Sequence, residues 1–316
     1  MHNARHPAPT GVVVMAHGTP GRPEEIAAFY TRIRRGSPPP PALLDELEGR
    51  YRAIGGTSPL AARTRAQVEG LAAALEATDP GRWTVRFGAK HTEPSIEEAV
   101  TRLSEAGVAR AVGIVLAPHF TGPGTGEYLE RAQSAGGAAG LEILPVRHWH
   151  RAPGMAGLVG RRVADAVAKV PAGTGPDHTA VLFTAHSVPV RVVDAGDPYP
   201  DQVAESAADA AAAAGLDAAG IGWSVAWQSA GRTADPWVGP DVLDEIRRLA
   251  ATGRTAVVVC PVGFISDHLE VLYDLDVEAR SVAEDAGLAY FDRTRSLNDD
   301  PELLAILAEV VRRAGS

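Results

Sequence analysis

The sequence predicts an α/β fold with two three-layer domains, over residues 1–150 and 151–316, that face each other across a cleft. Short runs rich in β-branched residues alternate with longer amphipathic segments along the whole chain, which is typical of parallel strands joined by crossover helices. A chain of 316 residues is long enough for two modest domains or one large one. The two halves also repeat each other at their strand ends, which favours the two-domain arrangement.

Eight apolar runs predict strands, four in each half of the chain. Each run is short and is bounded by polar or turn-forming residues. In order, the predicted strands are residues 11–16, 83–89, 111–117, 141–146, 180–184, 220–226, 255–260 and 288–290.

Longer segments between these runs predict helices. Some of them have a proline near the first turn, where the missing N–H costs nothing. The clearest are residues 59–77, 94–105, 200–214 and 267–286.

Two strand ends of the first half recur in the second half. Residues 14–20 and 183–189 both end a strand in the pattern Ala-His-small-x-Pro, and residues 114–120 and 257–264 both lead into a proline and then a phenylalanine. We interpret these matches as an old duplication. Because they are short, a single extended sheet is the alternative.

Composition excludes several classes of function. The net charge is −9, and no run of five or six Lys or Arg occurs, which argues against a nucleic-acid partner. Cys260 is the single cysteine, so the chain can form no internal disulfide, thiolate zinc site or four-cysteine iron–sulfur cluster. The first apolar run, residues 12–16, is too short for a signal peptide or a membrane span, and we expect a soluble, cytoplasmic protein.

Polar and unusual residues follow the predicted strands at their carboxyl ends. In open α/β sheets, ligands bind outside these ends, so a shared cleft is the predicted site. The residues concerned are His17, Lys90, His91, Pro118, His119, His186, Gln228 and Gly263.

A row of carboxylates begins just after the strand that ends at Cys260. On a helix, Glu270, Asp274 and Glu278 are spaced at i, i+4 and i+8 and lie on one face. Like charges at this spacing destabilise an isolated helix by roughly 0.2–0.5 kcal/mol per pair. The row therefore predicts a cation site or a proton path, and the alternative is a solvated face that starts with a capping box between Asp267 and Glu270.

His186 stands where a buried strand emerges. A neutral imidazole can accept a proton or bind a divalent metal near neutral pH. A hydrogen-bonded structural histidine is the alternative, and pairing with Glu270 is what favours a functional role.

A basic and aromatic segment, residues 29–36, precedes the stiff proline run 38–41. Arg34 and Arg35 offer fork-shaped donors for carboxylates beside an apolar side, so a flat hydrophobic ligand with acidic side arms would fit there. The alternative is an ordinary helix end, at which cations are favoured by the helix dipole.

Taken together, these segments resemble the ferrochelatase family along almost the whole chain, most of all the soluble enzymes of Gram-positive bacteria that insert iron into coproporphyrin III. The resemblance implies two Rossmann-like domains around a porphyrin cleft. The segments that carry it are residues 15–20, 31–36, 50–60, 116–120, 184–189, 197–202, 227–231, 235–242 and 263–276.

The resemblance also implies roles for the metal-binding residues. His186 and Glu270 would be the facing pair that binds iron and accepts the pyrrole protons. Asp274 and Glu278 would form an outer acidic site that, with Arg50, holds a hydrated cation such as Mg²⁺. No cofactor and no iron–sulfur cluster would be needed, because Fe²⁺ is a substrate.

Six residues match positions that contact the porphyrin or its propionates in the family. One of them departs from the pattern, because His17 stands where many of the Gram-positive enzymes have a tyrosine that approaches the iron. An imidazole there could ligate iron or could hydrogen-bond a strand end. The six are His17, Arg34, Arg50, Tyr51, Ser58 and Tyr128.

The expected partners are a tetrapyrrole, ferrous iron and, transiently, an enzyme that uses coproheme. Three alternatives stay open: a protoporphyrin IX ferrochelatase, a chelatase that loads cobalt or nickel into a corrin-type precursor, and a non-catalytic haem or porphyrin carrier.

Overall fold

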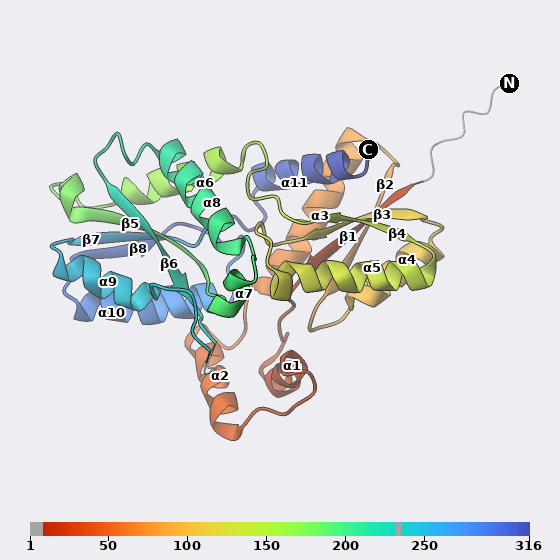
Figure 1. Cartoon of the computed structure of the whole chain (residues 1–316), viewed down its shortest axis with the longest axis horizontal. Coiled ribbons are helices and arrows are strands. Elements are labelled where there is room, and N and C mark those ends of the chain that lie inside the picture. Colours follow the sequence, from red (N-terminus) through yellow and green to blue (C-terminus); the bar gives the residue numbers. More distant parts are fainter. Residues whose placement is uncertain (1–8, 232–234) are drawn as a thin grey trace.

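The chain folds into two four-stranded sheets flanked by helices (Figure 1), as seen in a computed structural model that describes residues 9–231 and 235–316. All strand pairs in the two sheets are parallel. The strand orders are β2-β1-β3-β4 and β6-β5-β7-β8, so each sheet has the order second, first, third, fourth. This repeated topology confirms the α/β fold class and supports the duplication, and the single extended sheet is wrong.

The eight predicted strands are present, with ends shifted by a few residues. The largest shift is at the end of the last strand, which extends to Arg293. This strand begins at Tyr290 because Leu288 donates its N–H to the Ala283 carbonyl and completes the end of a helix instead. The strands are β1 (Thr10–Ala16), β2 (Trp83–Ala89), β3 (Arg110–Val115), β4 (Glu142–Val146), β5 (Thr179–His186), β6 (Gly222–Gln228), β7 (Ala256–Cys260) and β8 (Tyr290–Arg293).

Helices cover both faces of the sheets, and α1 and α2 project together from one side of the molecule (Figure 1). The α-helices are α1 (Ile26–Ile33), α2 (Pro41–Ala53), α3 (Leu60–Thr78), α4 (Ile96–Glu105), α5 (Glu127–Ala139), α6 (Met155–Val167), α7 (Val190–Asp194), α8 (Tyr199–Ala214), α9 (Val242–Ala251), α10 (Arg280–Asp285) and α11 (Pro301–Ala314).

The predicted helix at residues 267–286 differs from expectation in two ways. It begins at Leu269, and Val271–Ala279 winds as a π-helix that runs into α10. Asp267 lies before the helix, where its carboxylate accepts hydrogen bonds from Ser296 and Asn298, so the capping-box interpretation is wrong. π-Helical turns are rare and occur frequently at functional sites.

One hydrophobic core joins the two halves. It contains Val14 of β1 and Phe183 of β5, together with Leu303 and Leu307 of α11. The last helix therefore returns to the first half, where it packs beside α3 (Figure 1). The domain boundary near residue 150 falls between β4 and α6 and stays a prediction.

Candidate active site

The carboxyl ends of β1 and β5 open into one cavity of about 290 Å³. The first half contributes His17 and Tyr128 to its wall, and the second half contributes His186, His268 and Glu270. The structure thus brings together, from elements far apart in sequence, four of the residues that the sequence singled out. A shared cleft at the strand ends was the expected place for a site.

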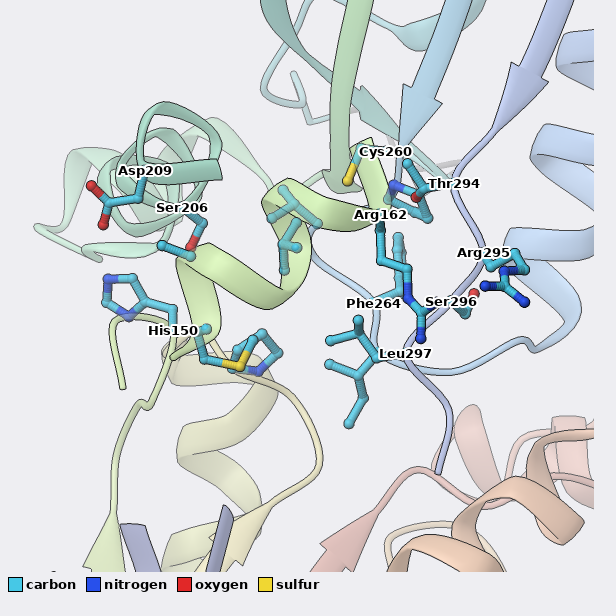
Figure 2. A pocket seen from close by; sticks show the side chains of 17 residues that line it. His150, Arg162, Ser206, Asp209, Cys260, Phe264, Thr294, Arg295, Ser296 and Leu297 are labelled. Carbon is cyan, nitrogen blue, oxygen red and sulfur yellow. The ribbon is translucent and has the colours of Figure 1, made fainter. Parts of the chain in front are cut away.

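A smaller cavity (Figure 2) shares Phe264 and Ile265 of its lining with the first one. It encloses about 30 Å³ near Cys260 and Arg162. That volume suits one or two waters and is far below what a tetrapyrrole needs. Burial raises the pKa of the Cys260 thiol to about 12, which makes the thiol unreactive.

His186 and Glu270 face each other at the centre of the site. The Nε2 atom of His186 lies 3.9 Å from Oε1 of Glu270. The other ring nitrogen, Nδ1, lies 2.6 Å from the carbonyl oxygen of Ser187 and donates a proton to it. Nε2 is therefore the ring nitrogen that faces the carboxylate, an arrangement that a proton or a cation between the two groups would stabilise.

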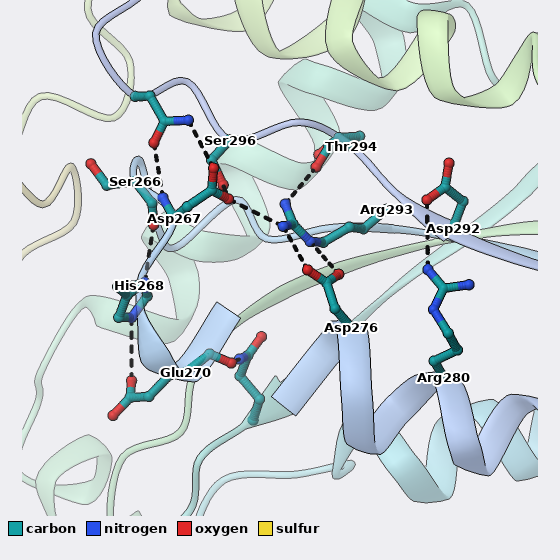
Figure 3. A network of polar contacts seen from close by, with 12 residues as sticks. Ser266, Asp267, His268, Glu270, Asp276, Arg280, Asp292, Arg293, Thr294 and Ser296 are labelled. Atoms are coloured by element: carbon teal, nitrogen blue, oxygen red, sulfur yellow. Dashed lines mark hydrogen bonds and ion pairs between the residues drawn. The ribbon is translucent and has the colours of Figure 1, made fainter. Parts of the chain in front are cut away.

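A second histidine supports the same carboxylate. The Nε2 atom of His268 lies 3.6 Å from Oε2 of Glu270 (Figure 3). Burial alone would raise the pKa of Glu270, but His186, His268 and His17 together lower it to about 2. The carboxylate is thus ionised at neutral pH. Sequence reasoning missed His268, although it lies only two residues before Glu270.

A polar network anchors the loop that carries His268 (Figure 3). Asp267 accepts hydrogen bonds from Ser296 and Asn298 and pairs with Arg293 at 3.1 Å. Arg293 also binds Asp276 through two nitrogens, at 2.6 and 2.9 Å. The loop before Glu270 is therefore tied to the strand β8 and to the π-helix at the same time.

The carboxylate row continues along the π-helix, where residues four apart remain neighbours on one face. One oxygen of Asp274 lies 3.4 Å from Nη1 of Arg50, and the other accepts a hydrogen bond from Ser229. Burial and the nearby Glu270 raise the pKa of Asp274 to about 6. Glu278 lies one turn further on and is half-buried.

The outer acidic site fits a bound metal poorly as it stands. Both Asp274 oxygens already have partners, and within residues 9–231 and 235–316 no group of three or more His, Cys, Asp or Glu side chains is arranged to hold a metal. Binding of Mg²⁺ by Asp274, Glu278 and Arg50 stays a prediction, and no chemical step is derived from it.

His17 presents its ring to the cavity from the opposite half of the chain. The ring packs against His91 and Phe29, with centroids 4.7 and 5.8 Å apart. Nδ1 lies 3.1 Å from the Gly18 carbonyl oxygen and can donate to it. Desolvation by the surrounding protein lowers the pKa of His17, and the contact at Nδ1 leaves Nε2 as the ring nitrogen available to act as an acceptor or a ligand.

Two of the expected porphyrin contacts are buried beside the site. Tyr128 lines the cavity with Lys90 Nζ 5.0 Å from its ring centre. Tyr51 is buried in α2 with its hydroxyl 3.4 Å from Oγ1 of Thr19, and burial raises its pKa. Burial raises the pKa of Tyr128 as well, so both phenols are neutral.

The other expected contacts lie outside the wall of this cavity. Ser58 is buried and accepts a hydrogen bond from the Leu60 N–H at the start of α3, so it has a structural role there. Arg34 follows α1, and its Nε atom is buried with no hydrogen-bond partner among the described residues. Arg50 stacks over Tyr273 at 4.9 Å as well as contacting Asp274.

Comparison with known proteins gives one consistent result. A family model described as Ferrochelatase matches residues 9–315. A protein named Ferrochelatase from Herpetosiphon aurantiacus is 39% identical over 306 residues, which are 96% of this chain and 98% of that protein. Proteins named Coproporphyrin III ferrochelatase from Bacillus pumilus and Bacillus subtilis are each 43% identical over 304 residues, 95% of this chain and 96% of theirs.

Solved structures of chelatases share the fold. SirB from Bacillus subtilis with Fe³⁺ has a TM-score of 0.57 at 12% identity and covers 98% of this chain and 96% of that one. CbiX, described as the terminal enzyme of sirohaem biosynthesis in denitrifying bacteria, has a TM-score of 0.53 at 17% identity, with 97% of this chain and 100% of that chain covered. None of the described helices is long and apolar enough to cross a membrane.

Proposed function

The chain belongs to the ferrochelatase family, and we propose that it inserts Fe²⁺ into coproporphyrin III, releasing two protons and forming iron coproporphyrin III. The observation that carries this proposal is the His186–Glu270 pair, 3.9 Å apart in a cavity walled by both halves of the chain. The names of the relatives support coproporphyrin III as the substrate.

The reaction needs a group that attracts the ion and a group that accepts protons. Glu270, with a pKa of about 2, is an anion at neutral pH and suits the first task. His186 has its Nδ1 committed to the Ser187 carbonyl, so the lone pair of Nε2 suits the second task and can also ligate Fe²⁺. In the proposed step, two pyrrole N–H bonds break as the iron–nitrogen bonds form: Nε2 of His186 accepts one proton, and the Glu270 carboxylate accepts the other, each passing its proton on to water.

We expect the propionate groups of coproporphyrin III to bind arginine side chains near the site. The four propionates need donors, and Arg34 and Arg50, at the ends of α1 and α2 and outside the cavity wall, are the residues that we expect to bind them. Arginine binds carboxylates with two parallel donors. This supports coproporphyrin III over protoporphyrin IX, which carries fewer carboxylates.

Anaerobic absorbance assays with Fe²⁺ test the proposal. The purified protein should convert coproporphyrin III to its iron complex with a higher kcat/KM than protoporphyrin IX. Faster turnover of protoporphyrin IX would assign that substrate instead. Insertion of cobalt or nickel into a corrin-type precursor alone would assign a different chelatase, and tight haem binding without insertion would assign a carrier.

Several sequence-based expectations accompany this proposal. We expect turnover without any added cofactor, reaction in the cytoplasm, and transient contact with an enzyme that uses coproheme. Each of them stays a prediction.

A further inference from the structure

Gln228 links the two elements that carry the His186–Glu270 pair: its backbone binds Ser187, next to His186, and its side chain binds the backbone of Glu270. We propose that Gln228 is a positioning residue that fixes the distance between His186 Nε2 and the Glu270 carboxylate. This inference rests on the proposed function, because it concerns the same site and the same reaction.

The backbone of Gln228 holds Ser187, the residue whose carbonyl oxygen orients the His186 ring. Gln228 is the last residue of β6 and lies opposite His186 in the parallel pair with β5. The Ser187 N–H donates to the Gln228 carbonyl at 2.8 Å, and the Ser187 carbonyl in turn accepts the Nδ1 proton of His186 at 2.6 Å. The orientation of the imidazole therefore depends on where β6 ends.

The side chain of Gln228 holds the start of the helix that carries Glu270. Its Nε2 atom donates to the Glu270 carbonyl oxygen at 3.3 Å. The residue is 1% exposed, and its Oε1 atom has no partner among the described residues. A buried amide with an unsatisfied oxygen is uncommon in folded proteins, because burying such an oxygen costs free energy. We therefore attribute a specific role to the one hydrogen bond that the Gln228 side chain makes.

Ser229, the next residue, contacts the same helix one turn further on, at Asp274. Ser229 has a φ of 59°, which is unusual for a residue other than glycine, and its hydroxyl donates to the Asp274 carboxylate. Gln228 and Ser229 thus contact two successive turns of the acidic row. Together these two contacts fix the position of the acidic row relative to His186.

Such positioning matters because the pair comes from separate elements. His186 ends β5, whereas Glu270 follows β7 and the loop after it. A displacement of about 1 Å in a reacting group can lower a rate by about 100-fold. Without the Gln228 amide, the 3.9 Å separation of the two groups would be less well defined.

The test compares Gln228→Met, which keeps most of the volume and removes the donor, with a matched control. The control is Thr184→Val, because Thr184 is fully buried in β5, two residues before His186, and its hydroxyl has no partner among the described residues. We expect Gln228→Met to lower kcat for iron insertion at least 10-fold, with the KM for coproporphyrin III changed less than 2-fold. Thr184→Val should resemble wild type in both measurements.

A second variant covers the case in which Gln228→Met does not fold. Gln228→Glu keeps the length, and its carboxyl donates to the Glu270 carbonyl only while protonated, so its kcat relative to wild type should fall as pH rises. Wild-type kcat and pH profiles in the Gln228 variants, or equal losses in Thr184→Val, would overturn the positioning role. A wild-type protein that inserts no iron would instead overturn the proposed function.

Discussion

The Nε2 atom of His186 lies 3.9 Å from Oε1 of Glu270, and the Nδ1 atom of the same ring is hydrogen-bonded to the Ser187 carbonyl oxygen. This relationship gives the two groups different tasks. The carboxylate stays ionised because three histidines surround it, and the hydrogen bond at Nδ1 of His186 leaves Nε2 as the nitrogen that faces the carboxylate. A divalent cation that enters the cavity therefore meets one oxygen ligand and one nitrogen ligand.

Replacing His268 should change the pH dependence of the reaction. The variant His268→Phe removes a group that lowers the pKa of Glu270, so that carboxylate should become protonated at a higher pH. The acidic limb of the kcat profile should then shift upward in pH. The exposed His148, changed to Phe, is the control, and coincident profiles for His268→Phe and wild type would contradict the role given to His268.

Asp274 should make the apoprotein less stable as pH rises. Its pKa of about 6 in the folded state lies above the ordinary value of 3.8, so the folded state binds the proton more tightly than the unfolded state does. The contribution to the free energy of unfolding is therefore present below about pH 4 and is lost by about pH 6, by on the order of 3 kcal/mol. Urea unfolding of Asp274→Asn should lack this loss, and parallel wild-type and variant curves from pH 4 to pH 7 would contradict it.

Arg50 should affect porphyrin binding more than chemistry. Loss of a charge-assisted hydrogen bond to a propionate typically costs about 1.5–3 kcal/mol, so Arg50→Ala should raise the KM for coproporphyrin III about 10-fold or more while kcat changes little. Arg52→Ala is the matched control, since Arg52 is on the same helix with its side chain 70% exposed. An equal effect in both variants would show that the charge of α2, rather than Arg50 itself, is responsible.

His17 should be visible in the spectrum of the bound product. Its ring lines the same cavity as His186 and Glu270, and imidazole nitrogen is a good ligand for iron. His17→Phe keeps the ring and removes the ligand, so the Soret band of bound iron coproporphyrin should shift. Identical absorbance spectra for the two proteins would mean that His17 acts as a strand-end hydrogen-bonding group.

The strand ends of the site could be predicted from sequence because they depend on local patterns. His17 and His186 each follow a β-branched run, and a parallel sheet places such residues at one edge. The carboxylates from Glu270 to Glu278 also share one face as expected, although Val271–Ala279 is a π-helix and not the expected α-helix. Spacings of four place side chains on one face in both an α-helix and a π-helix.

The remaining features depend on contacts between distant segments. No periodicity distinguishes a π-helix from an α-helix over Val271–Ala279, because its extra residue per turn is stabilised by surrounding contacts. Gln228 reaches Glu270 across 42 residues, and α11 returns to α3 across more than two hundred. Hydropathy of single segments carries no information about either contact.

Rapid-mixing measurements on wild type, His186→Ala and Glu270→Gln test the central claim most directly, because they separate porphyrin binding from iron insertion. Quenching of protein fluorescence reports the binding of coproporphyrin III, and absorbance under anaerobic conditions reports insertion. Each variant should bind the porphyrin with a Kd within about 3-fold of wild type and should insert iron at least 100-fold more slowly, as expected for the loss of a proton acceptor or metal ligand. Near-normal insertion by either variant would contradict the assignment of His186 and Glu270 as the reacting pair.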